Sequence, residues 1–392
     1  MDLKRILIVA PYNSGTIGLC SLNLYNAFVQ NTNFKVKCVY VHKFKNGYDG
    51  FKNCEYCVSK EAPVYLKWLN LFKQIVWLRK IKKEFNPDIT ISTLGSCSTI
   101  NVLSGGHEKK IGVFHSPHYQ EKAKGWIVYL HTLFEYKFVY LHLDRLACVS
   151  SEVKRSIVTT FHAYRHKDVQ VIYNVHNIES ILQKSRDDIP AEELDIVTEK
   201  SILYVGRLDK NKAPMRTLYA FSQSLSYLPR SSNLIFIGKD VDNLKPKLND
   251  FIEEHNLKER VFFFGFRDNP YKYLARAGCL VSSSYSEGLP GVMIESLLLG
   301  TPVVTTNSSE GIWEIMSCHK DYDAKLSRIY KCDDGYITSN ISRLDNDVND
   351  VSNLSKALSE CLSEHSSVSF NFRKKINGDL IVKQFVAKLF NH

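Results

Sequence analysis

Short apolar runs alternate with segments of helical pattern from one end of the chain to the other. Most of these runs are β-branched or aromatic and are followed by Gly, Ser, Asn or Pro, which is typical of buried parallel strands. In the first half the predicted strands are Arg5–Ala10, Lys35–Val41, Ile89–Ser92, Lys110–Phe114, Arg145–Val149 and Val169–Tyr173. In the second half they are Ser201–Val205, Asn233–Ile237, Val261–Phe264, Cys279–Ser282 and Pro302–Thr305. Helical patterns such as Ser21–Gln30 and Pro290–Leu299 lie between the strands.

This alternation predicts a doubly wound α/β fold, and the chain goes through it twice. A length of 392 residues fits two domains at about 100–200 residues each. The polar, acidic stretch at 180–200 marks the boundary. We therefore expect two Rossmann-like domains, 1–180 and 195–377, facing a central cleft. The last segment, 378–392, contains a helix at 378–390 that we expect to pack back on the first domain.

Composition and charge narrow the class of protein. The apolar fraction of 44% and the charged fraction of 23% are ordinary for a globular protein, which excludes a disordered chain, a collagen-like repeat and a small disulfide scaffold. The formal net charge of +10 is unevenly placed. Residues 1–180 hold 24 Lys and Arg against 13 Asp and Glu, a net of +11, while residues 181–392 hold 27 against 28. An anionic partner should therefore meet the first half.

Cysteine usage and the first residues bear on the compartment. The ten cysteines lie singly, apart from the C-x-x-C pair of Cys54 and Cys57, and no second pair completes a zinc site. Reduced thiols in the cytosol are the simpler interpretation. The first apolar run ends at Pro11 and is too short for a signal peptide. We expect a cytoplasmic protein.

The longest apolar stretch is Trp126–Leu143. It contains His131, Glu135, Lys137 and His142, which a membrane span would not carry. This pattern predicts a core helix with one polar face, and no membrane crossing is expected.

The segment 282–305 carries the most informative pattern. Glu287 and Glu295 stand with seven residues between them, around a loop that leads into a helix near Pro290. The free N–H groups of such a helix start can bind a phosphate. The two carboxylates would flank that phosphate pocket and bind sugar hydroxyls. Either glutamate alone would be interpreted as a solvated charge, but Gly288, Pro290, Gly300 and Pro302 fall at fixed positions around the pair.

A second segment, 203–214, combines a strand with a basic loop. The strand runs into Gly206, and Arg207 and Lys212 follow in the loop. Ligands of open α/β sheets bind at the carboxyl ends of strands, where these two cations could neutralise a diphosphate. Two ordinary surface cations are the alternative.

At these residues the sequence resembles the retaining family 4 of nucleotide-sugar glycosyltransferases, which have the GT-B fold. Glu287 and Glu295 match its E-x7-E signature, and Gly206, Arg207, Leu208 and Lys212 match its G-R-L-x4-K signature. Weaker similarities lie at 147–155, 171–174 and 261–266.

The resemblance implies how the donor is held. Arg207 and Lys212 would bind the donor diphosphate and stabilise the charge that grows on it. Glu295 would accept hydrogen bonds from the ribose hydroxyls. Glu287 would contact the transferred sugar, which places it among the catalytic residues. Backbone N–H groups of Gly288 and Leu289 would help to hold the sugar and the phosphate.

In the first domain the family has a glycine-rich loop after the first strand. The matching loop is 13–18, in which Gly15 fits and Thr16 replaces the usual second glycine, with Gly18 displaced. Gly15 and Thr16 are therefore expected to approach the donor diphosphate.

The family also places a histidine near the donor sugar, at the end of a later strand. His115 directly follows the apolar run 110–114 and is the preferred candidate, with His118 as the alternative. A hydrogen-bonded structural histidine would fit the same position. An H-x-x-H zinc pair lacks further ligands.

No metal is expected. The D-x-D patterns at 240–242 and 345–347 look like those of metal-dependent glycosyltransferases of another fold, but they lie in polar segments away from both motifs. With Arg207 and Lys212 available, the diphosphate needs no divalent ion.

The basic excess includes 62–85, where aromatic and aliphatic residues alternate with Lys73, Lys80, Lys82 and Lys83. Aromatic residues beside a cationic face are typical of a helix that lies on a membrane surface, and each basic residue near an anionic leaflet can add about 1 kcal/mol. A core helix with a solvated basic side fits the same pattern. No recognised nucleic-acid motif is present, and no nucleic-acid partner is expected.

The sequence therefore predicts a retaining hexosyl- or N-acetylhexosaminyl-type glycosyltransferase on the inner face of the plasma membrane. Its donor would be a nucleotide diphosphate sugar, with a UDP-sugar favoured. Its acceptor would be a glycan, such as a lipid-linked O-antigen or capsule repeat. A non-catalytic nucleotide-sugar or glycan-binding protein on the same scaffold is the alternative.

Overall fold

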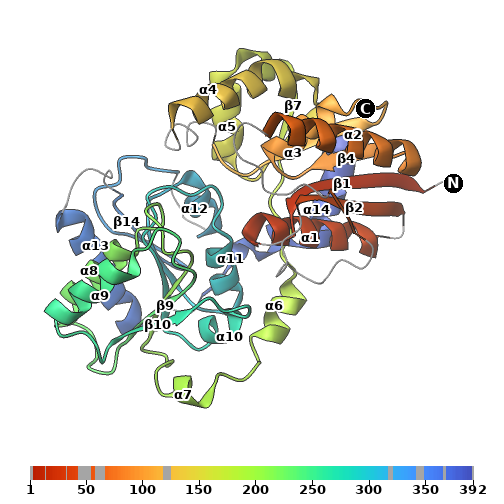
Figure 1. Cartoon of the computed structure of the whole chain (residues 1–392). Coiled ribbons are helices and arrows are strands. Elements are labelled where there is room, and N and C mark those ends of the chain that lie inside the picture. Colours follow the sequence, from red (N-terminus) through yellow and green to blue (C-terminus); the bar gives the residue numbers. More distant parts are fainter. Residues whose placement is uncertain are drawn as a thin grey trace. The chain divides into compact units, whose positions relative to one another are not determined.

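The computed structural model describes residues 3–13, 15–31, 33–42, 54–57, 67–117, 125–316, 321–340, 348–364 and 368–390 (Figure 1). The chain divides into two compact units. Unit 1 comprises Met1–Asn177 and Lys374–His392, and unit 2 comprises Ile178–Arg373.

Unit 1 is built on a seven-stranded parallel sheet with the order β3-β2-β1-β4-β5-β6-β7. Its strands are β1 Lys4–Tyr12, β2 Phe34–His42, β3 Glu55–Tyr56, β4 Ile89–Ser92, β5 Lys109–Phe114, β6 Arg145–Cys148 and β7 Asp168–Val171. The strand order reverses between β1 and β4. This reversal is the topological switch point at which open α/β sheets bind ligands.

Helices cover both faces of this sheet. In Figure 1, α2, α3, α4 and α5 lie along one side of the sheet, and α1 and α14 lie along the other. The helical elements are α1 Gly15–Gln30, α2 Lys67–Phe85, α3 Gly95–Leu103, α4 Trp126–Phe134, η3 Glu135–Val139, η4 Tyr140–His142, α5 Ser151–Thr160, η5 His162–His166, α14 Gly378–Phe385 and η7 Val386–Phe390. The right-handed crossovers of parallel strands account for this division, since the chain winds outward from β1 in both directions.

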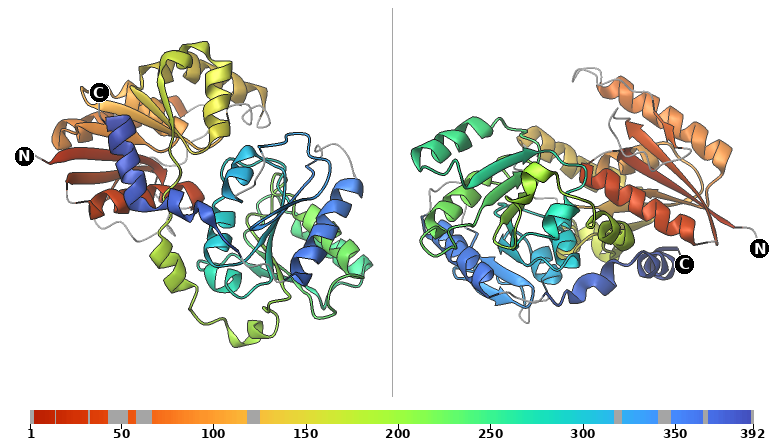
Figure 2. Two further views of the ribbon diagram at one scale, coloured as in Figure 1. Left: turned by 180° about the vertical axis from the view of Figure 1, so that it is seen from behind. Right: turned by 90° about the horizontal axis from the view of Figure 1, so that it is seen from below.

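The C-terminal segment packs on α1. The rings of Phe28 and Phe390 stack with centroids 5.8 Å apart, and Phe385 meets Phe28 edge-on at 5.6 Å. The Lys109 ammonium donates to the Phe390 carbonyl (3.1 Å). Both views of Figure 2 place this blue segment beside the red N-terminal elements. The last 19 residues thus belong to the first unit, although about 200 residues of unit 2 separate them in sequence.

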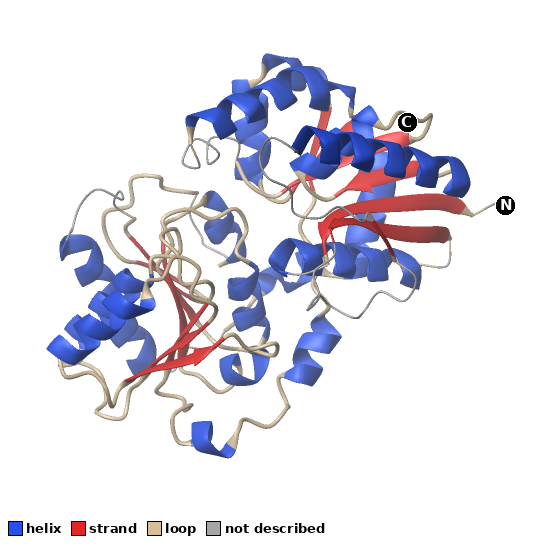
Figure 3. Cartoon of the chain, in the orientation of Figure 1, coloured by secondary structure: helices blue, strands red, loops and turns tan. Residues whose placement is uncertain are grey.

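Unit 2 has a second seven-stranded sheet, with the order β10-β9-β8-β11-β12-β14-β13. The strands are β8 Ile202–Val205, β9 Leu234–Ile237, β10 Val261–Gly265, β11 Cys279–Ser282, β12 Val303–Thr306, β13 Tyr330–Cys332 and β14 Gly335–Thr338. All pairs are parallel except β13 with β14. The helical elements are α6 Ile178–Lys184, α7 Ala191–Leu194, α8 Pro214–Ser224, α9 Lys245–Glu254, α10 Tyr271–Leu274, α11 Gly291–Leu298, α12 Glu310–Ile315, α13 Val348–Ser363 and η6 Asn371–Ile376, which runs on into unit 1. Figure 3 shows the layers by element type.

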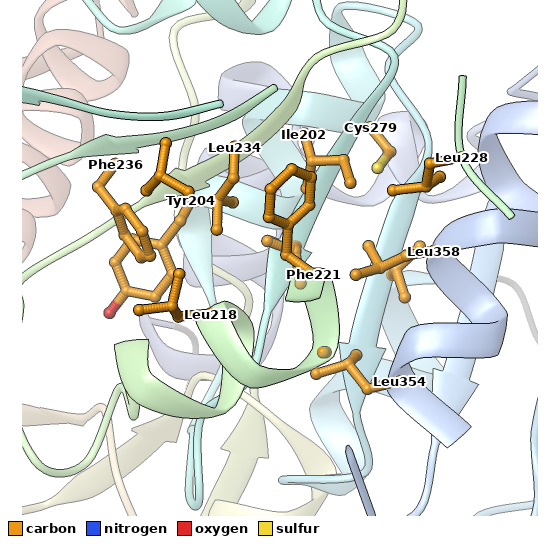
Figure 4. Packing of buried hydrophobic residues seen from close by; sticks show 14 of the residues in the cluster. Ile202, Tyr204, Leu218, Phe221, Leu228, Leu234, Phe236, Cys279, Leu354 and Leu358 are labelled. Atoms are coloured by element: carbon orange, nitrogen blue, oxygen red, sulfur yellow. The ribbon is translucent and has the colours of Figure 1, made fainter. Parts of the chain in front are cut away.

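The core of unit 2 joins the sheet to α8, α9 and α13. Ile202, Leu234 and Cys279 bring three strands together, and Phe221 of α8 and Leu358 of α13 pack against them (Figure 4). All five side chains are buried. The apolar face of the predicted strands therefore fixes the sheet under α8, whose first turn adjoins the basic loop 206–213.

The two-domain Rossmann-like architecture confirms the predicted fold class. Each predicted strand overlaps an observed one, with ends that differ by one or two residues. The sequence pattern missed β3, β13 and β14. These strands have two to four residues and lie at or next to the sheet edges, where little apolar sequence marks them.

One predicted core helix is wrong in its first half. Trp126–Leu143 was expected to be a core helix, but α4 has no buried residue. Burial begins only in η3 and η4, with Tyr136, Val139 and Tyr140. The segment therefore begins to pack on the rest of unit 1 only at η3, and the side chains of α4 stay exposed or half-buried.

Helix α2 packs on the core and also presents a mixed outer face. Leu78 and Ile81 are buried against β1 and β2, whereas Leu69 and Phe72 are exposed. Lys82, expected among the surface cations, is buried and pairs with Glu108 (2.7 Å). Burial lowers the pKa of Lys82 to about 8. None of the described helices is long and apolar enough to span a bilayer.

Candidate active site

The site in unit 2 lies at the switch point of its sheet. Strands β8 and β11 are neighbours there, with β9 on the far side of β8. The loop 206–213 follows β8, and the loop 283–290 follows β11. The adjacent carboxyl ends therefore bring the two motif segments together.

Close backbone packing fixes the start of the first loop. A Cβ atom at Gly238 would lie 1.7 Å from the Gly206 carbonyl oxygen. Leu208 N–H donates to the Lys239 carbonyl (2.9 Å), which ties the same two loops. Position 238 thus admits only glycine, and the backbone that carries Arg207 is held against the neighbouring loop.

Asp209 contacts both Arg207 and Lys212 of this loop. Its Oδ1 accepts the Lys212 N–H (2.8 Å), and its Oδ2 lies 2.8 Å from Arg207 Nη2. Asp209 is buried, while the Arg207 side chain is 63% exposed. The buried carboxylate therefore steers an exposed guanidinium that remains accessible to an anion.

A direct bond joins the two motifs. Lys212 Nζ lies 2.6 Å from Glu287 Oε1, with the side chains 23% and 11% exposed. Asn211 adds two bonds to the same loop: its side chain donates to the Ser286 carbonyl, and its carbonyl accepts the Tyr285 N–H, both at 2.8 Å. The structure thus brings Lys212 and Glu287 together, although 75 residues separate them in sequence.

The loop after Glu287 packs against the start of α12. The Glu287 N–H donates to the Ser308 carbonyl (3.3 Å), and a Cβ at Gly311 would lie 2.4 Å from the Gly288 carbonyl oxygen. Leu289 is buried beside Gly311. This packing fixes the backbone that leads into α11.

Glu295 lies in the second turn of α11 and has a different environment. The Tyr271 hydroxyl of α10 lies 3.4 Å from its Oε1. Burial raises the pKa of Glu295 to about 7, because the desolvated carboxylate is costly to ionise. Hydrogen-bond donors from a ligand would favour its charged form.

Arg216 is a residue that the sequence reasoning missed. It is buried in the first turn of α8, and its Nη1 donates to the Ser283 carbonyl (3.2 Å) and to Asn340 Oδ1 (3.0 Å). The guanidinium lies 4.7 Å from the centroid of the Tyr285 ring. Arg216 thereby braces the loop that carries Glu287. The sequence feature that could have identified Arg216 is its position on the apolar face of α8, four residues before Ala220.

In unit 1 the loop after β1 leads directly into α1. Gly15 has a φ of +67° and is exposed, as is Thr16. Gly18 is buried, and a Cβ there would lie 2.9 Å from the Tyr12 carbonyl oxygen. The close approach therefore falls at Gly18, and the open surface falls at Gly15 and Thr16.

His115 follows β5 and lies beside a pocket near the β1/β4 switch point. Ser21, Thr93 and Asn174 line this pocket with it. Burial lowers the pKa of His115 to about 4, opposed by a hydrogen bond with the backbone of Thr93. Within the described part of the chain its Nε2 has no hydrogen-bond partner. His115 is thus a neutral imidazole whose buried Nε2 makes no hydrogen bond to the described residues. The alternative, His118, lies outside the described residues.

The D-x-D pattern at 240–242 has a structural role. Asp240 accepts the N–H groups of Leu244 and Lys245, and Asp242 accepts that of Lys210. The second pattern, 345–347, lies outside the described residues. Across the described ranges, no three His, Cys, Asp or Glu side chains gather as metal ligands. The cysteines of these ranges, including Cys54 and Cys57, are free thiols.

Two Rossmann-like sheets with joined basic and acidic loops at a switch point define a GT-B glycosyltransferase. Models of two families match the chain: Glycosyltransferase Family 4 over residues 23–180, and Glycosyl transferases group 1 over residues 185–323. Together they match more than half of the chain. It therefore belongs to the family 4 type of GT-B glycosyltransferases.

Relatives agree with this family. An uncharacterized glycosyltransferase of Methanocaldococcus jannaschii is 27% identical over 71% of this chain and 70% of its own. The N-acetylgalactosamine-N,N'-diacetylbacillosaminyl-diphospho-undecaprenol 4-alpha-N-acetylgalactosaminyltransferase of Campylobacter jejuni is 36% identical over 38% of each chain. The structure of Anabaena HepE in complex with UDP and glucose covers 99% of each chain, with a TM-score of 0.72 and 15% identity.

Proposed function

We propose that this enzyme transfers a hexosyl or N-acetylhexosaminyl group from a nucleotide diphosphate sugar, with retention of configuration. A UDP-sugar is the favoured donor. The observation that carries the proposal is the 2.6 Å contact between Lys212 and Glu287, because it joins the cation that would bind phosphate to the carboxylate that would bind the sugar.

The leaving diphosphate would meet Arg207 and Lys212. As the bond between the anomeric carbon and the phosphate oxygen breaks, negative charge grows on that oxygen, and two cations held in advance stabilise it. Glu287 would accept a hydrogen bond from a hydroxyl of the transferred sugar, and Glu295 would accept hydrogen bonds from the ribose hydroxyls. Backbone N–H groups of Gly288 and Leu289 would complete the grip.

The acceptor hydroxyl would attack on the face that the leaving phosphate vacates. The new bond forms between its oxygen and the anomeric carbon, and its proton passes to the departing phosphate oxygen. Unit 1 would supply His115, with Gly15 and Thr16 near the diphosphate. With its pKa lowered to about 4, His115 is suited to accept a hydrogen bond from a sugar hydroxyl rather than to carry charge.

The acceptor we propose is a growing bacterial surface glycan on a lipid diphosphate. The Campylobacter jejuni relative is named for a diphospho-undecaprenol acceptor. The basic first half of this chain, with a net charge of +11 over residues 1–180, suits such an anionic, membrane-bound acceptor. The enzyme would then act as a peripheral protein on the inner face of the plasma membrane, with no nucleic-acid partner.

We also propose that transfer needs no metal ion. Arg207 and Lys212 supply positive charge to the diphosphate, a task that a divalent ion performs elsewhere. Activity that survives a chelator would support this, and activity restored only by Mg²⁺ or Mn²⁺ would contradict it.

The test is a panel of UDP-, GDP- and dTDP-sugars, offered with and without a lipid-linked glycan acceptor. We expect one nucleotide to be released at the rate of transfer, and NMR of the product to show the anomeric configuration of the donor. Lys210→Ala serves as the matched control for Lys212→Ala, since Lys210 is an exposed cation of the same loop. A panel in which no donor is consumed would overturn the enzyme proposal.

A further inference from the structure

Helix α4 exposes its apolar side chains. Ile127 is 82% exposed, and Trp126, Phe134 and Phe138 are each more than half exposed. No residue of α4 is buried. Contiguous apolar surface of this kind is rare on a soluble protein and marks a site of interaction.

The exposed side chains form one row. Trp126, Leu130, Phe134 and Phe138 follow one another at intervals of four residues, with Ile127 beside the first. Successive residues four apart drift round an α-helix, but α4 continues into the π-helix η3, whose wider turn rotates Phe138 back into line. The rings of Phe134 and Phe138 lie 5.0 Å apart. We call these five residues the α4 row.

The row does not stabilise the fold, because other residues anchor the helix. Tyr136 and Val139 of η3 are buried, and the Tyr136 ring stacks on Phe161 with centroids 4.7 Å apart. The anchor therefore lies at the C-terminal end, and α4 projects from it. Polar substitutions in the row should leave folding intact.

The helical segment that carries the row has no exposed carboxylate. The only acid between residues 125 and 142 is Glu135, which is buried, accepts the Thr99 hydroxyl (2.6 Å) and lies 3.5 Å from His131 Nδ1. Lys137 of η3 is an exposed cation. An apolar row with cations and no exposed carboxylate complements an anionic lipid surface.

The same layer of helices supplies further cations. Helix α2 lies on the same side of the unit 1 sheet as α4 (Figure 1). Its Lys73, Lys80 and Lys83 are exposed, with the Lys80 side chain at 75%. These lysines belong to the segment 62–85, for which the sequence left two alternatives, a helix on a membrane surface and a core helix with a solvated basic side.

We propose that the α4 row inserts into the headgroup region of an anionic bilayer and that the lysines of α2 add electrostatic attraction. The inference rests on the proposed function, since it says how the enzyme reaches a lipid-linked acceptor. A second copy of the chain is a poorer occupant, because self-association through the row would gather the cations of both copies, Lys137 among them, at one interface.

The test is flotation of the full chain with vesicles of phosphatidylcholine alone and of phosphatidylcholine mixed with phosphatidylglycerol. Ile127→Ser/Phe134→Ser removes two members of the row. The matched control, Leu194→Ser/Tyr227→Ser, removes two exposed apolar side chains from unit 2. We expect the row variant to bind anionic vesicles at least about tenfold more weakly, and the control to bind like the wild type. Both variants should keep the wild-type melting midpoint.

Several results would overturn the proposal. These are a wild type that does not float with anionic vesicles, a row variant that floats like the wild type, and a control that loses as much binding as the row variant. Sedimentation of the same proteins tests the other occupant: a wild-type dimer that the row variant dissociates, with vesicle binding unchanged, would assign the row to self-association.

Donor turnover separates this proposal from the proposed function. Nucleotide-sugar hydrolysis without acceptor should be equal in the wild type and the row variant, because the row variant keeps every residue assigned to donor binding. A wild type that floats through the row but consumes no donor would refute the proposed function alone. A wild type that turns over donor but does not float would refute the membrane inference alone.

Discussion

Arg207 and Lys212 together form the proposed diphosphate clamp, and removing the Lys212 ammonium tests it most directly. In Lys212→Ala the leaving diphosphate loses one of two preformed cations, and loss of a single preorganised charge partner costs about 10²–10³ in kcat. The loss should fall mainly on kcat, because the charge on the leaving oxygen is greatest in the transition state. Lys210→Ala, in the same loop, should stay within about twofold of the wild type.

The structure also predicts a cost in stability. Without Lys212 the Glu287 carboxylate, only 11% exposed, loses its partner at 2.6 Å. Loss of a hydrogen bond to a charged group costs about 2 kcal/mol, equivalent to a fall of roughly 4–8 °C in the melting midpoint of a unit of this size. Lys212→Ala/Glu287→Gln removes both charges, so its melting midpoint should return toward the wild-type value while transfer remains lost.

The assay is steady-state transfer with the donor chosen by the panel, together with thermal melting of each variant. Lys212→Ala that keeps more than about a tenth of the wild-type kcat would refute the clamp. Recovery of transfer in the double variant would also refute it, since the activity would then follow stability rather than the cation.

Three further predictions concern residues around the clamp. The pKa of Glu295 is about 7, and under the proposed function its ionised form would accept hydrogen bonds from the ribose hydroxyls. Donor affinity should therefore fall about tenfold per pH unit below 7, and titration calorimetry should show this in the wild type and a flat profile in Glu295→Gln. Arg216→Lys keeps the charge but loses the paired hydrogen bonds to Ser283 and Asn340 that brace the loop after β11. The donor KM should therefore rise about tenfold with kcat nearly unchanged. A purely structural role would instead lower the active fraction of the enzyme and hence kcat. Gly238→Ala should lower the free energy of unfolding by about 2 kcal/mol or more in denaturant titration, because its Cβ would lie 1.7 Å from the Gly206 carbonyl oxygen. The control Gly206→Ala, whose Cβ would have no contact under 3.9 Å, should cost far less.

Strand positions could be predicted because buried parallel strands leave a strong signal. Residues 89–92 and 279–282 are short, β-branched or apolar runs that end at polar residues, and the structure has strands with those bounds. The edge strands gave no comparable signal. Hydropathy also failed at α4, since an apolar helical face looks the same in sequence whether it meets a core or an outside partner.

The candidate site was predicted in its residues but not in its contacts. Motif spacing singled out Lys212 and Glu287, which are 75 positions apart, yet only the order of the strands brings them together, because β8 and β11 are neighbours in the sheet. Arg216 was missed because its role depends on three loop ends that meet only in the folded chain.

The same geometry explains how the clamp can stand ready before a donor arrives. Two cations in one loop repel each other, and long basic side chains lose conformational entropy when they are fixed. Here carboxylates hold them in place: Asp209 holds Arg207, and Glu287 holds Lys212. An incoming diphosphate would compete for both cations, and the release of Glu287 would turn its carboxylate toward the hydroxyls of the attached sugar. Under the proposed function, the Lys212–Glu287 ion pair therefore holds both side chains close to the positions that transfer requires. Breaking this ion pair would couple phosphate binding to sugar binding.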